Sequence, residues 1–275
     1  MTLSTIRNNP AKQKKVKTKK QKAIAATCAV AFWLLVWHVV SLCVGSELVL
    51  VSPVKVVQTL FTVIFDPDFL KTVWYSAARI LGGFFTALTL GTVLGWVASR
   101  FWVVETLLRP ITAAIKATPV ASFIILVLLW FSGKNLSVII SMLMVFPVIY
   151  MNVLEGIRSA DEELLEMAQV FRLSVSKKLL YIYLPAVAPF FVSACSVSLG
   201  LCWKSGIAAE VIGTPDGSIG AVFYQAKIFL QTSELLAWTV VVVAVSVAFE
   251  KLFMFLLRLV LKKLKMEDVL NGKRA

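Results

Sequence analysis

The ionisable side chains that stand inside apolar stretches of this chain are the first candidates for chemistry. Lys204 and Glu210 lie six residues apart near the end of one such stretch. Because an ionised group is costly at membrane depth, charged residues there often mark a transport pathway or a gate. The same residues would also fit an outer membrane interface, with Lys204 reaching up to water, or a structural pair. The first interpretation indicates a pathway or gate and the second a structural role, and neither indicates bond making.

Residues suited to covalent catalysis or metal binding are scarce. His38 is the only histidine, and one imidazole forms neither a catalytic triad nor a metal site alone. The chain has no Gly-x-x-x-x-Gly-Lys-Ser/Thr phosphate loop, so ATP hydrolysis would need another polypeptide. We therefore expect neither an enzyme nor a metal or cofactor site in this chain. The cysteines lack Cys-x-x-Cys spacing and read as small buried hydrophobic side chains: Cys28, Cys43, Cys195 and Cys202.

Long apolar stretches are the elements that must position these residues. The 275 residues are 59% hydrophobic and 16% charged, whereas a soluble domain carries about 25% charged residues. A helix of roughly 20 apolar residues crosses the hydrocarbon core of a bilayer. The sequence predicts an all-α polytopic membrane protein with six transmembrane helices, near 23–44, 77–99, 109–131, 136–154, 185–204 and 236–260. The first stretch exceeds the apolar region of a signal peptide, about 7–15 residues, and is read as a retained helix.

The basic residues predict the orientation of these helices. Eight of the 28 Lys and Arg residues lie in the first 22 positions, and such runs stay on the cytoplasmic side. We interpret 1–22 as a basic cytoplasmic tail, 23–260 as the six-helix transmembrane domain and 261–275 as a second basic cytoplasmic tail. Six crossings then place 100–108 and 155–184 inside, where further basic residues lie. The net charge of +13 is not interleaved with aromatic residues, which argues against nucleic-acid binding.

Two features interrupt the apolar pattern on the first half of the chain. Val56, Leu60, Val63 and Ile64 recur at helical spacing, which predicts an amphipathic helix along the outer interface. Pro119 lies inside the third predicted span, where a proline removes a backbone donor and clashes with the preceding turn. We expect a kink there, either as a packing feature or as part of a pathway.

The segment after Glu210 is rich in residues that break helices. Gly213, Pro215, Gly217 and Gly220 predict a stretch that is not regular helix throughout. An outer gate, a landing site for a binding protein and a simple turn would each fit it.

The internal segment 155–184 carries a helix pattern of its own. Ser159 followed by Glu162 is typical of a capping box, and further acidic residues complement the helix dipole. Apolar side chains then recur at helical spacing, at Leu164, Leu165, Ala168 and Phe171. The sequence predicts a short amphipathic helix on the cytosolic face.

Residues 166–185 resemble the cytoplasmic signature of permeases of binding-protein-dependent ABC importers. That signature reads Glu-Ala-Ala-x-x-x-Gly, then nine residues, then Ile-x-Leu-Pro. The chain departs from it at Met167, in place of an alanine, and at Arg172, in place of the glycine. Since glycine permits the positive φ that ends such a helix, Arg172 bears on the local turn more than on docking. The matching residues are Glu166, Ala168, Ile182, Leu184 and Pro185.

Three further stretches, 76–84, 116–119 and 203–210, are similar to permeases grouped with sulfonate, taurine and nitrate importers. Similar sequences also serve thiamine-precursor and other vitamin-like solutes. The resemblance implies a type I ABC importer permease in a bacterial inner or plasma membrane, with both ends inside. Its residues for ATPase coupling would be Glu166, Ala168, Arg172, Ile182, Leu184 and Pro185. Its candidates for the pathway or a gate would be Pro119, Trp203, Lys204 and Glu210.

The resemblance also implies partners. These would be ATP-binding cassette ATPase subunits that hold ATP and Mg²⁺, an extracytoplasmic substrate-binding protein, a second copy of the permease and membrane lipid. The main alternative is the same machinery importing a thiamine precursor or vitamin-like solute. An ion-coupled carrier or channel would be expected to have carboxylates in its span centres, and we interpret the span centres of this chain as lacking them.

Overall fold

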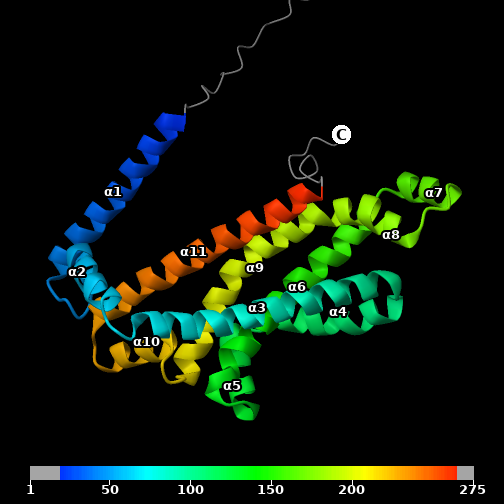
Figure 1. Ribbon diagram of the computed structural model, residues 1–275. Coiled ribbons are helices and arrows are strands. Elements are labelled where there is room, and N and C mark those ends of the chain that lie inside the picture. The colour runs from blue at the N-terminus through cyan, green and yellow to red at the C-terminus, as the bar shows by residue number, and fades with distance from the viewer. Residues whose placement is uncertain (1–18, 265–275) are drawn as a thin grey trace, which may run out of the picture. The chain divides into compact units, whose positions relative to one another are not determined.

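The computed structural model describes residues 19–264, and every regular element within them is a helix (Figure 1). The chain divides into two compact units, 1–55 and 56–275. The helices, in chain order, are α1 Lys19–Val44, α2 Pro53–Ile64, α3 Phe69–Arg100, α4 Trp102–Ala117, α5 Val120–Trp130, α6 Gly133–Arg158, α7 Glu162–Val170, α8 Val175–Lys178, the π-helical turn η1 Leu179–Tyr183, α9 Leu184–Gly213, α10 Ile219–Ile228 and α11 Thr232–Lys263.

In the first unit, α1 contains an apolar stretch, Thr27–Val44, long enough to cross a membrane. The helix ends where Gly45 takes a positive φ of 64° and its backbone N–H donates to Ser41 at 3.2 Å. The predicted tail 1–22 lies outside the described residues except for 19–22, which begin α1. At the other end of the chain, 261–263 complete α11, and the predicted tail beyond Leu264 also lies outside the described part.

Five helical segments of the described chain are long and apolar enough to cross a membrane, and a sixth exists if α4 and α5 count as one bent span. The prediction of six spanning helices is confirmed on that count. The third span differs most from the expectation, because α4 and α5 meet at 110°. The fifth also differs, because α9 continues to Gly213 and so carries Lys204 and Glu210 within the helix.

The break between α4 and α5 lies at Pro119, where the sequence predicts a milder kink. Thr118 has extended backbone angles and its N–H donates to Ala114 at 3.0 Å, which closes α4. Pro119 then begins α5 by accepting from the N–H of Ser122 at 3.0 Å. A residue before proline avoids helical angles, and here that preference ends the helix. Pro110 and Pro147, by contrast, lie inside continuous helices.

The core of the second unit is formed by α3, α6 and α9. Glycines on α3 let it approach α6 closely. A Cβ atom on Gly83 would lie 2.4 Å from the carbonyl oxygen of Val138, and one on Gly91 would lie 2.9 Å from the side chain of Ile149. Small residues at such positions allow tight packing of membrane helices. The largest side chains of this core are Ile80, Phe84, Ile149, Leu199 and Trp203.

The ends of several helices meet in a separate apolar cluster near α10. Val63 of α2 packs with Ile219 of α10 and Trp238 of α11, and the rings of Phe69 and Trp238 lie 5.6 Å apart. The predicted helix exists and buries Val56 and Val63, but Ile64, predicted on the same apolar face, is exposed. Its position along the outer interface stays a prediction. The predicted irregular stretch is confined to 214–218, since Gly220 belongs to α10, a helix that the sequence analysis did not predict.

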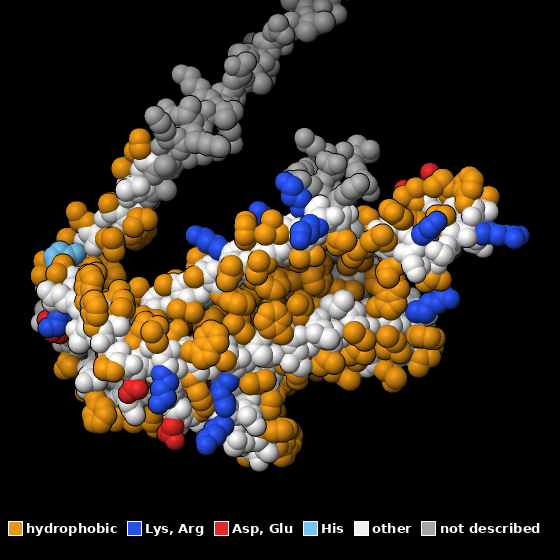
Figure 2. Space-filling model, in the orientation of Figure 1, with side chains coloured by type: hydrophobic (Ala, Val, Ile, Leu, Met, Phe, Trp, Pro, Cys, Tyr) orange, Lys and Arg blue, Asp and Glu red, His pale blue; other side chains and the backbone are white. Residues whose placement is uncertain are grey.

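Hydrophobic side chains cover most of the face shown in Figure 2, over the middle of the long helices. Large apolar residues such as Leu90, Val93, Val243 and Val247 are exposed on α3 and α11. Lipid is the solvent that suits such a surface.

Candidate functional site

Helix α7, which the sequence predicts on the cytosolic face, begins at a cap different from the one predicted. Asp161 is the capping residue, and its Oδ1 accepts from the N–H of Glu163 at 2.9 Å and from the N–H of Leu164 at 3.5 Å. Ser159 instead donates its hydroxyl to the carbonyl of Gly156 at 2.9 Å. The predicted capping box of Ser159 and Glu162 is therefore wrong, because α6 runs on to Arg158 and Ser159 closes that helix.

The end of α7 has the left-handed turn that a glycine at position 172 would favour. Arg172 has a positive φ of 49°, its N–H donates to Gln169 at 3.0 Å, and the N–H of Leu173 donates to Ala168 at 2.9 Å. These two bonds with a left-handed residue form a Schellman motif. The chain therefore makes this turn with arginine in the left-handed conformation.

One side of α7 is anchored to the segment that leads into α9. Ala168 is fully buried against Ile182 and Ala160, with Leu165 and Leu173 partly buried around them. Two residues of the signature, Ala168 and Ile182, thus lie in one apolar cluster. Two others, Leu184 and Pro185, lie in the first turn of α9, where Leu184 packs against Ala188 and Leu261.

The other side of α7 is exposed. Glu166 and Met167 both face outward, and Met167 is 49% exposed. Leu164 and Phe171, predicted on the apolar side of the helix, are exposed as well. The apolar residues of α7 therefore divide into an inward group and an unpartnered outward group. Figure 1 shows α7 projecting past the ends of α6 and α9.

The four pathway candidates occupy different environments. Lys204 is exposed although it lies well inside α9, and Pro119 is exposed at the break before α5. Trp203 is 2% exposed and packs in the core. Glu210 is fully buried. Only Lys204 and Pro119 lie on a surface of the described chain.

Glu210 joins three helices through one buried serine. Its Oε2 accepts from the hydroxyl of Ser76 in α3 at 2.6 Å and from the N–H of Gly220 in α10 at 3.4 Å. The same serine oxygen accepts from the N–H of Ile219 at 2.9 Å. A Cβ on Gly220 would lie 2.2 Å from the Cβ of Glu210, so only glycine allows this approach. This arrangement supports a structural role for the carboxylate.

Arg79 lies one turn of α3 beyond Ser76. Its guanidinium carbon lies 4.4 Å from the centre of the Tyr75 ring, a cation–π contact. Its buried Nη1 has no hydrogen-bond partner among residues 19–264.

A cavity between α4 and α6 contains cations that the sequence analysis did not select. It has a volume of about 480 Å³, and Arg109, Lys116 and Met151 are among its lining residues. Lys116 places its Nζ 3.5 Å from the sulfur of Met151. The spacing of seven between the two cations places them on one face of a helix, a signal that hydropathy alone overlooks.

A carboxylate also lies near the middle of α11. Glu250 accepts from the hydroxyl of Ser196 in α9 at 3.1 Å and is partly buried. The expectation that the span centres lack carboxylates is therefore wrong. The error arose because one acidic residue barely lowers the hydropathy of so apolar a helix.

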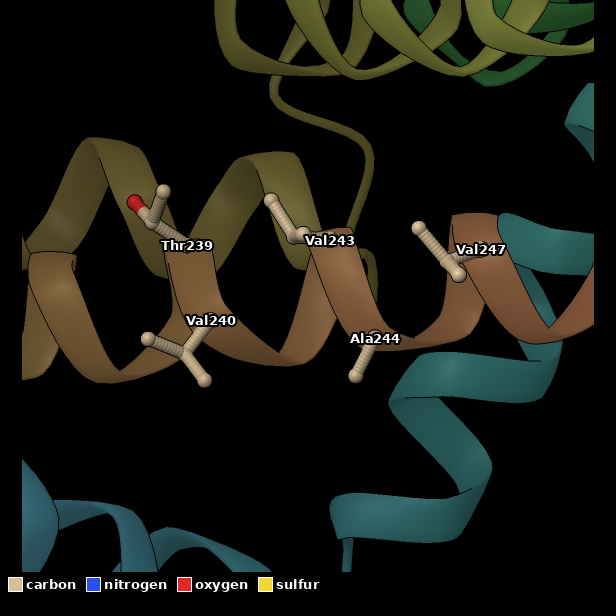
Figure 3. A pocket seen from close by; sticks show the side chains of 5 residues that line it. All are labelled: Thr239, Val240, Val243, Ala244 and Val247. Atoms are coloured by element: carbon tan, nitrogen blue, oxygen red, sulfur yellow. The ribbon is translucent and has the colours of Figure 1, made fainter. Parts of the chain in front are cut away.

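The four cysteines and the hollow on α11 do not indicate a catalytic or metal-binding site. Cys195 and Cys202 are buried as predicted, whereas Cys28 and Cys43 are exposed, and none forms a disulfide within the described chain. A hollow on α11 is lined by side chains of that one helix (Figure 3), and such a face suits lipid chains. Its lining residues are Thr239, Val240, Val243, Ala244 and Val247.

Long apolar helices around a tight core, with an amphipathic helix at one end, define a polytopic membrane permease. The family model for the binding-protein-dependent transport system inner membrane component matches residues 87–266, and the chain belongs to that family. It is 29% identical over 216 residues to the aliphatic sulfonates transport permease protein SsuC of Bacillus subtilis, covering 78% of each chain. The taurine transport system permease protein TauC of Escherichia coli is 27% identical over 220 residues, covering 78% of this chain and 80% of its own.

The nitrate import permease protein NrtB of Synechocystis is 25% identical over 214 residues, covering 74% of this chain and 76% of its own. A solved amino acid ABC transporter has a TM-score of 0.50 at 16% identity, covering 70% of this chain and 96% of its own, which supports the fold. The chain is thus a permease of a bacterial ABC importer, in the branch that contains sulfonate, taurine and nitrate permeases.

Proposed function

We propose that this permease receives work from a separate ATP-binding cassette subunit through α7, and that this partner binds the ATP and Mg²⁺. The observation that carries the proposal is the division of α7 into an anchored and an exposed side. Ala168 and Ile182 fix the helix to its own chain, whereas Glu166 and Met167 are free to contact a partner. A helix held in this way moves as a rigid body when its exposed side is displaced.

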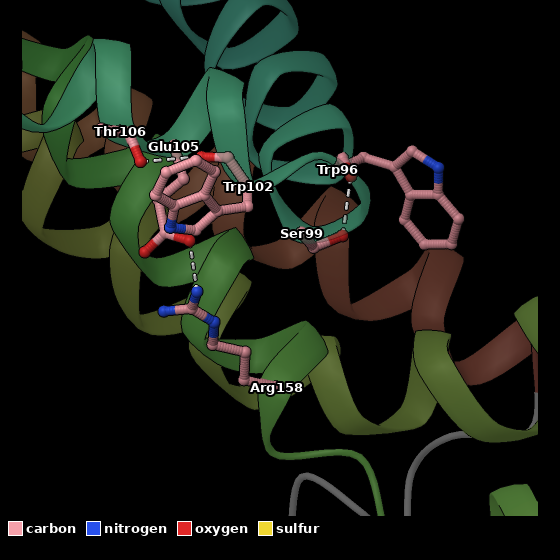
Figure 4. Close-up of polar contacts among 6 residues, drawn as sticks. All are labelled: Trp96, Ser99, Trp102, Glu105, Thr106 and Arg158. Carbon is pink, nitrogen blue, oxygen red and sulfur yellow. Dashed lines mark hydrogen bonds and ion pairs between the residues drawn. The ribbon is translucent and has the colours of Figure 1, made fainter.

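The connections of α7 would carry that displacement into the core. It follows α6 after a short turn and leads through α8 and η1 into α9, where Leu184 and Pro185 begin the helix. Arg158 at the end of α6 also forms an ion pair with Glu105 in the first turn of α4 (Figure 4). Because α4 runs from this pair to its end at Ala117, just before Pro119, the pair would link the motion of α7 to the break between α4 and α5.

The pathway itself would need a second copy of the chain. Lys204 is exposed on the long helix α9, and such a cation needs water or a polar neighbour at membrane depth. Two permeases facing each other would enclose a polar pathway lined by Lys204 and by the residues around Pro119. Trp203 and Glu210 would support that surface from behind. A substrate-binding protein outside would deliver the solute.

The solute that best fits is a small anion, such as a sulfonate, taurine, nitrate or a similar molecule. Arg109 and Lys116 line a cavity beside the α4–α5 break, and Lys204 adds a third cation. The named relatives transport aliphatic sulfonates, taurine and nitrate. A thiamine precursor or vitamin-like solute is the alternative, and it would not require these cations. Glu250 is the one observation that favours an ion-coupled carrier or channel.

Uptake into proteoliposomes that contain the permease, its ATPase and its binding protein tests the proposal. We expect uptake of an alkanesulfonate or nitrate only with ATP on the ATPase side. Lys116→Gln should reduce the rate by a factor of about 10 to 150, since a charge-assisted contact contributes about 1.5–3 kcal/mol. Lys177→Gln, on the exposed cytosolic side, is the matched control and should leave uptake unchanged. Uptake driven by an ion gradient without ATP, or equal uptake of a neutral vitamin precursor by both variants, would contradict the proposal.

A further inference from the structure

A second cavity lies at the inner end of the bundle, where α3 and α6 finish and α8 and η1 begin. Its volume is about 440 Å³, and both charged and apolar side chains line it. The residues that bear on its chemistry are Trp96, Ser99, Arg100, Ile157, Lys178 and Tyr183.

Two cations from distant parts of the sequence meet at this cavity. Arg100 is the last residue of α3, and Lys178 is the last residue of α8. No acidic residue lines the cavity, and neither cation has an ion-pair partner within residues 19–264. The ion pair of Glu105 and Arg158 lies apart from Trp96 in Figure 4. Lys178 is partly buried and lines the cavity, whereas its neighbour Lys177 is exposed and does not line it. Such a pair of cations is suited to bind an anion.

Aromatic side chains indicate the depth of the cavity in the membrane. The rings of Trp96 and Tyr183 meet edge to face at 5.7 Å, and Phe101 and Trp102 are exposed on the adjoining turn. Tryptophan and tyrosine concentrate at the level of the lipid headgroups. The positive-inside distribution places this end of α3 in the cytoplasmic leaflet. Ser99 donates its hydroxyl to the carbonyl of Trp96 at 2.7 Å, so Arg100 and Lys178 are the charged donors of the site.

We propose that this cavity binds the phosphate of an anionic phospholipid from the cytoplasmic leaflet. Arg100 and Lys178 would hold the phosphate, and the apolar surface of Ile157 together with the Trp96 ring would contact the glycerol and upper acyl chain. Basic pockets between membrane helices on the cytoplasmic side recognise such headgroups. The apolar side chains of the lining, Ile157 and Leu179, favour a lipid over free phosphate. The aromatic pair favours a lipid over an acidic side chain of the ATPase. The proposal rests on membrane insertion alone and not on the transported solute.

Native mass spectrometry of the full-length permease, titrated with phosphatidylglycerol, tests this site. Phosphatidylcholine with the same acyl chains separates headgroup charge from chain binding. Each of Arg100→Gln and Lys178→Gln should weaken the tightest phosphatidylglycerol site roughly fivefold, and the double variant about 25-fold. Lys177→Gln is the matched control and should bind as the wild type does. Thermal unfolding of each variant verifies that the fold is intact.

Several results would overturn the proposal. Loss of lipid in Lys177→Gln equal to that in Lys178→Gln would indicate general surface charge. Displacement of the lipid by millimolar inorganic phosphate would indicate a free anion site, and its release by the ATPase subunit would indicate a protein contact. A second readout uses a brominated phosphatidylglycerol, which should quench the fluorescence of the wild type more than that of Trp96→Phe. Equal quenching of the two proteins would also contradict the site.

Discussion

Arg172 occupies a backbone position that side chains rarely adopt. Its positive φ and the two hydrogen bonds across the turn keep the geometry that ends α7. A left-handed conformation costs a residue with a Cβ roughly 1–2 kcal/mol relative to glycine. The burial of Ala168 and Leu173 beside the turn compensates for this cost. The end of α7 is therefore held by packing in spite of local strain.

Arg172→Gly should stabilise the end of α7 by about 1 kcal/mol, because glycine removes that strain. The protection of the Leu173 amide against hydrogen exchange should rise about fivefold. Arg172→Ala keeps a Cβ and removes the charge, so it should leave the protection unchanged. An equal gain in both variants would show that the charge, and not the backbone, limits the stability of this turn.

The buried hydrogen bonds of Ser76 predict that its replacement lowers the free energy of unfolding. Ser76→Ala would leave the N–H of Ile219 without its buried acceptor and take one donor from Glu210. An unsatisfied buried group costs about 1–3 kcal/mol, so the unfolding free energy in detergent should fall by that amount. Ser205→Ala is the matched control, since this buried hydroxyl donates only to carbonyls of its own helix. Equal losses in the two variants would contradict the role of Ser76 as the link between α3 and α10.

Among the helices, those that the sequence predicts well are the ones with continuous apolar runs. The first, second, fourth and sixth predicted spans correspond to α1, α3, α6 and α11. The break at Pro119 was underestimated because the effect of a proline depends on the residue before it and on nearby packing, as Pro110 and Pro147 show. The end of α9 was placed too early because Lys204 and Glu210 interrupt the hydropathy while the backbone continues.

Adjacent glycines in α3 provide a matched test of the helix packing. Gly83→Ala would bring its Cβ to 2.4 Å from the carbonyl of Val138 and force α3 away from α6. We expect a loss of several kcal/mol and a low yield of folded protein. Gly82→Ala has nothing within 4 Å of the new atom and should be neutral or slightly stabilising. Similar thermal stability of the two variants would contradict the close contact of α3 with α6.

At the scale of the whole molecule, the sequence predicts the coupling signature better than the contacts between helices. The signature could be recognised in the sequence because the spacing of its residues is kept, although Met167 and Arg172 differ from the signature. The structure explains this spacing, because it packs Ala168 against Ile182. The cavity cations Arg109 and Lys116 were missed because their proximity to Met151 depends on how α4 lies against α6. Hydropathy identifies spans but not the faces they turn to one another.

The exposed Lys204 predicts that the assembled transporter contains two permease copies. Native mass spectrometry of the complex with its ATPase should give a mass that includes two of these 275-residue chains. A complex with a single permease and no second membrane subunit would contradict the shared pathway.

Coupling through α7 is the central claim, and the rate of ATP hydrolysis in proteoliposomes tests it most directly. Glu166 is exposed on α7, so Glu166→Lys should leave insertion and thermal stability intact. The wild type should hydrolyse ATP faster when the loaded binding protein is added, and Glu166→Lys should lose that stimulation together with uptake. Glu155→Lys, an exposed charge reversal on α6, should retain both. Equal stimulation of the wild type and Glu166→Lys would show that α7 does not receive the work of the ATPase.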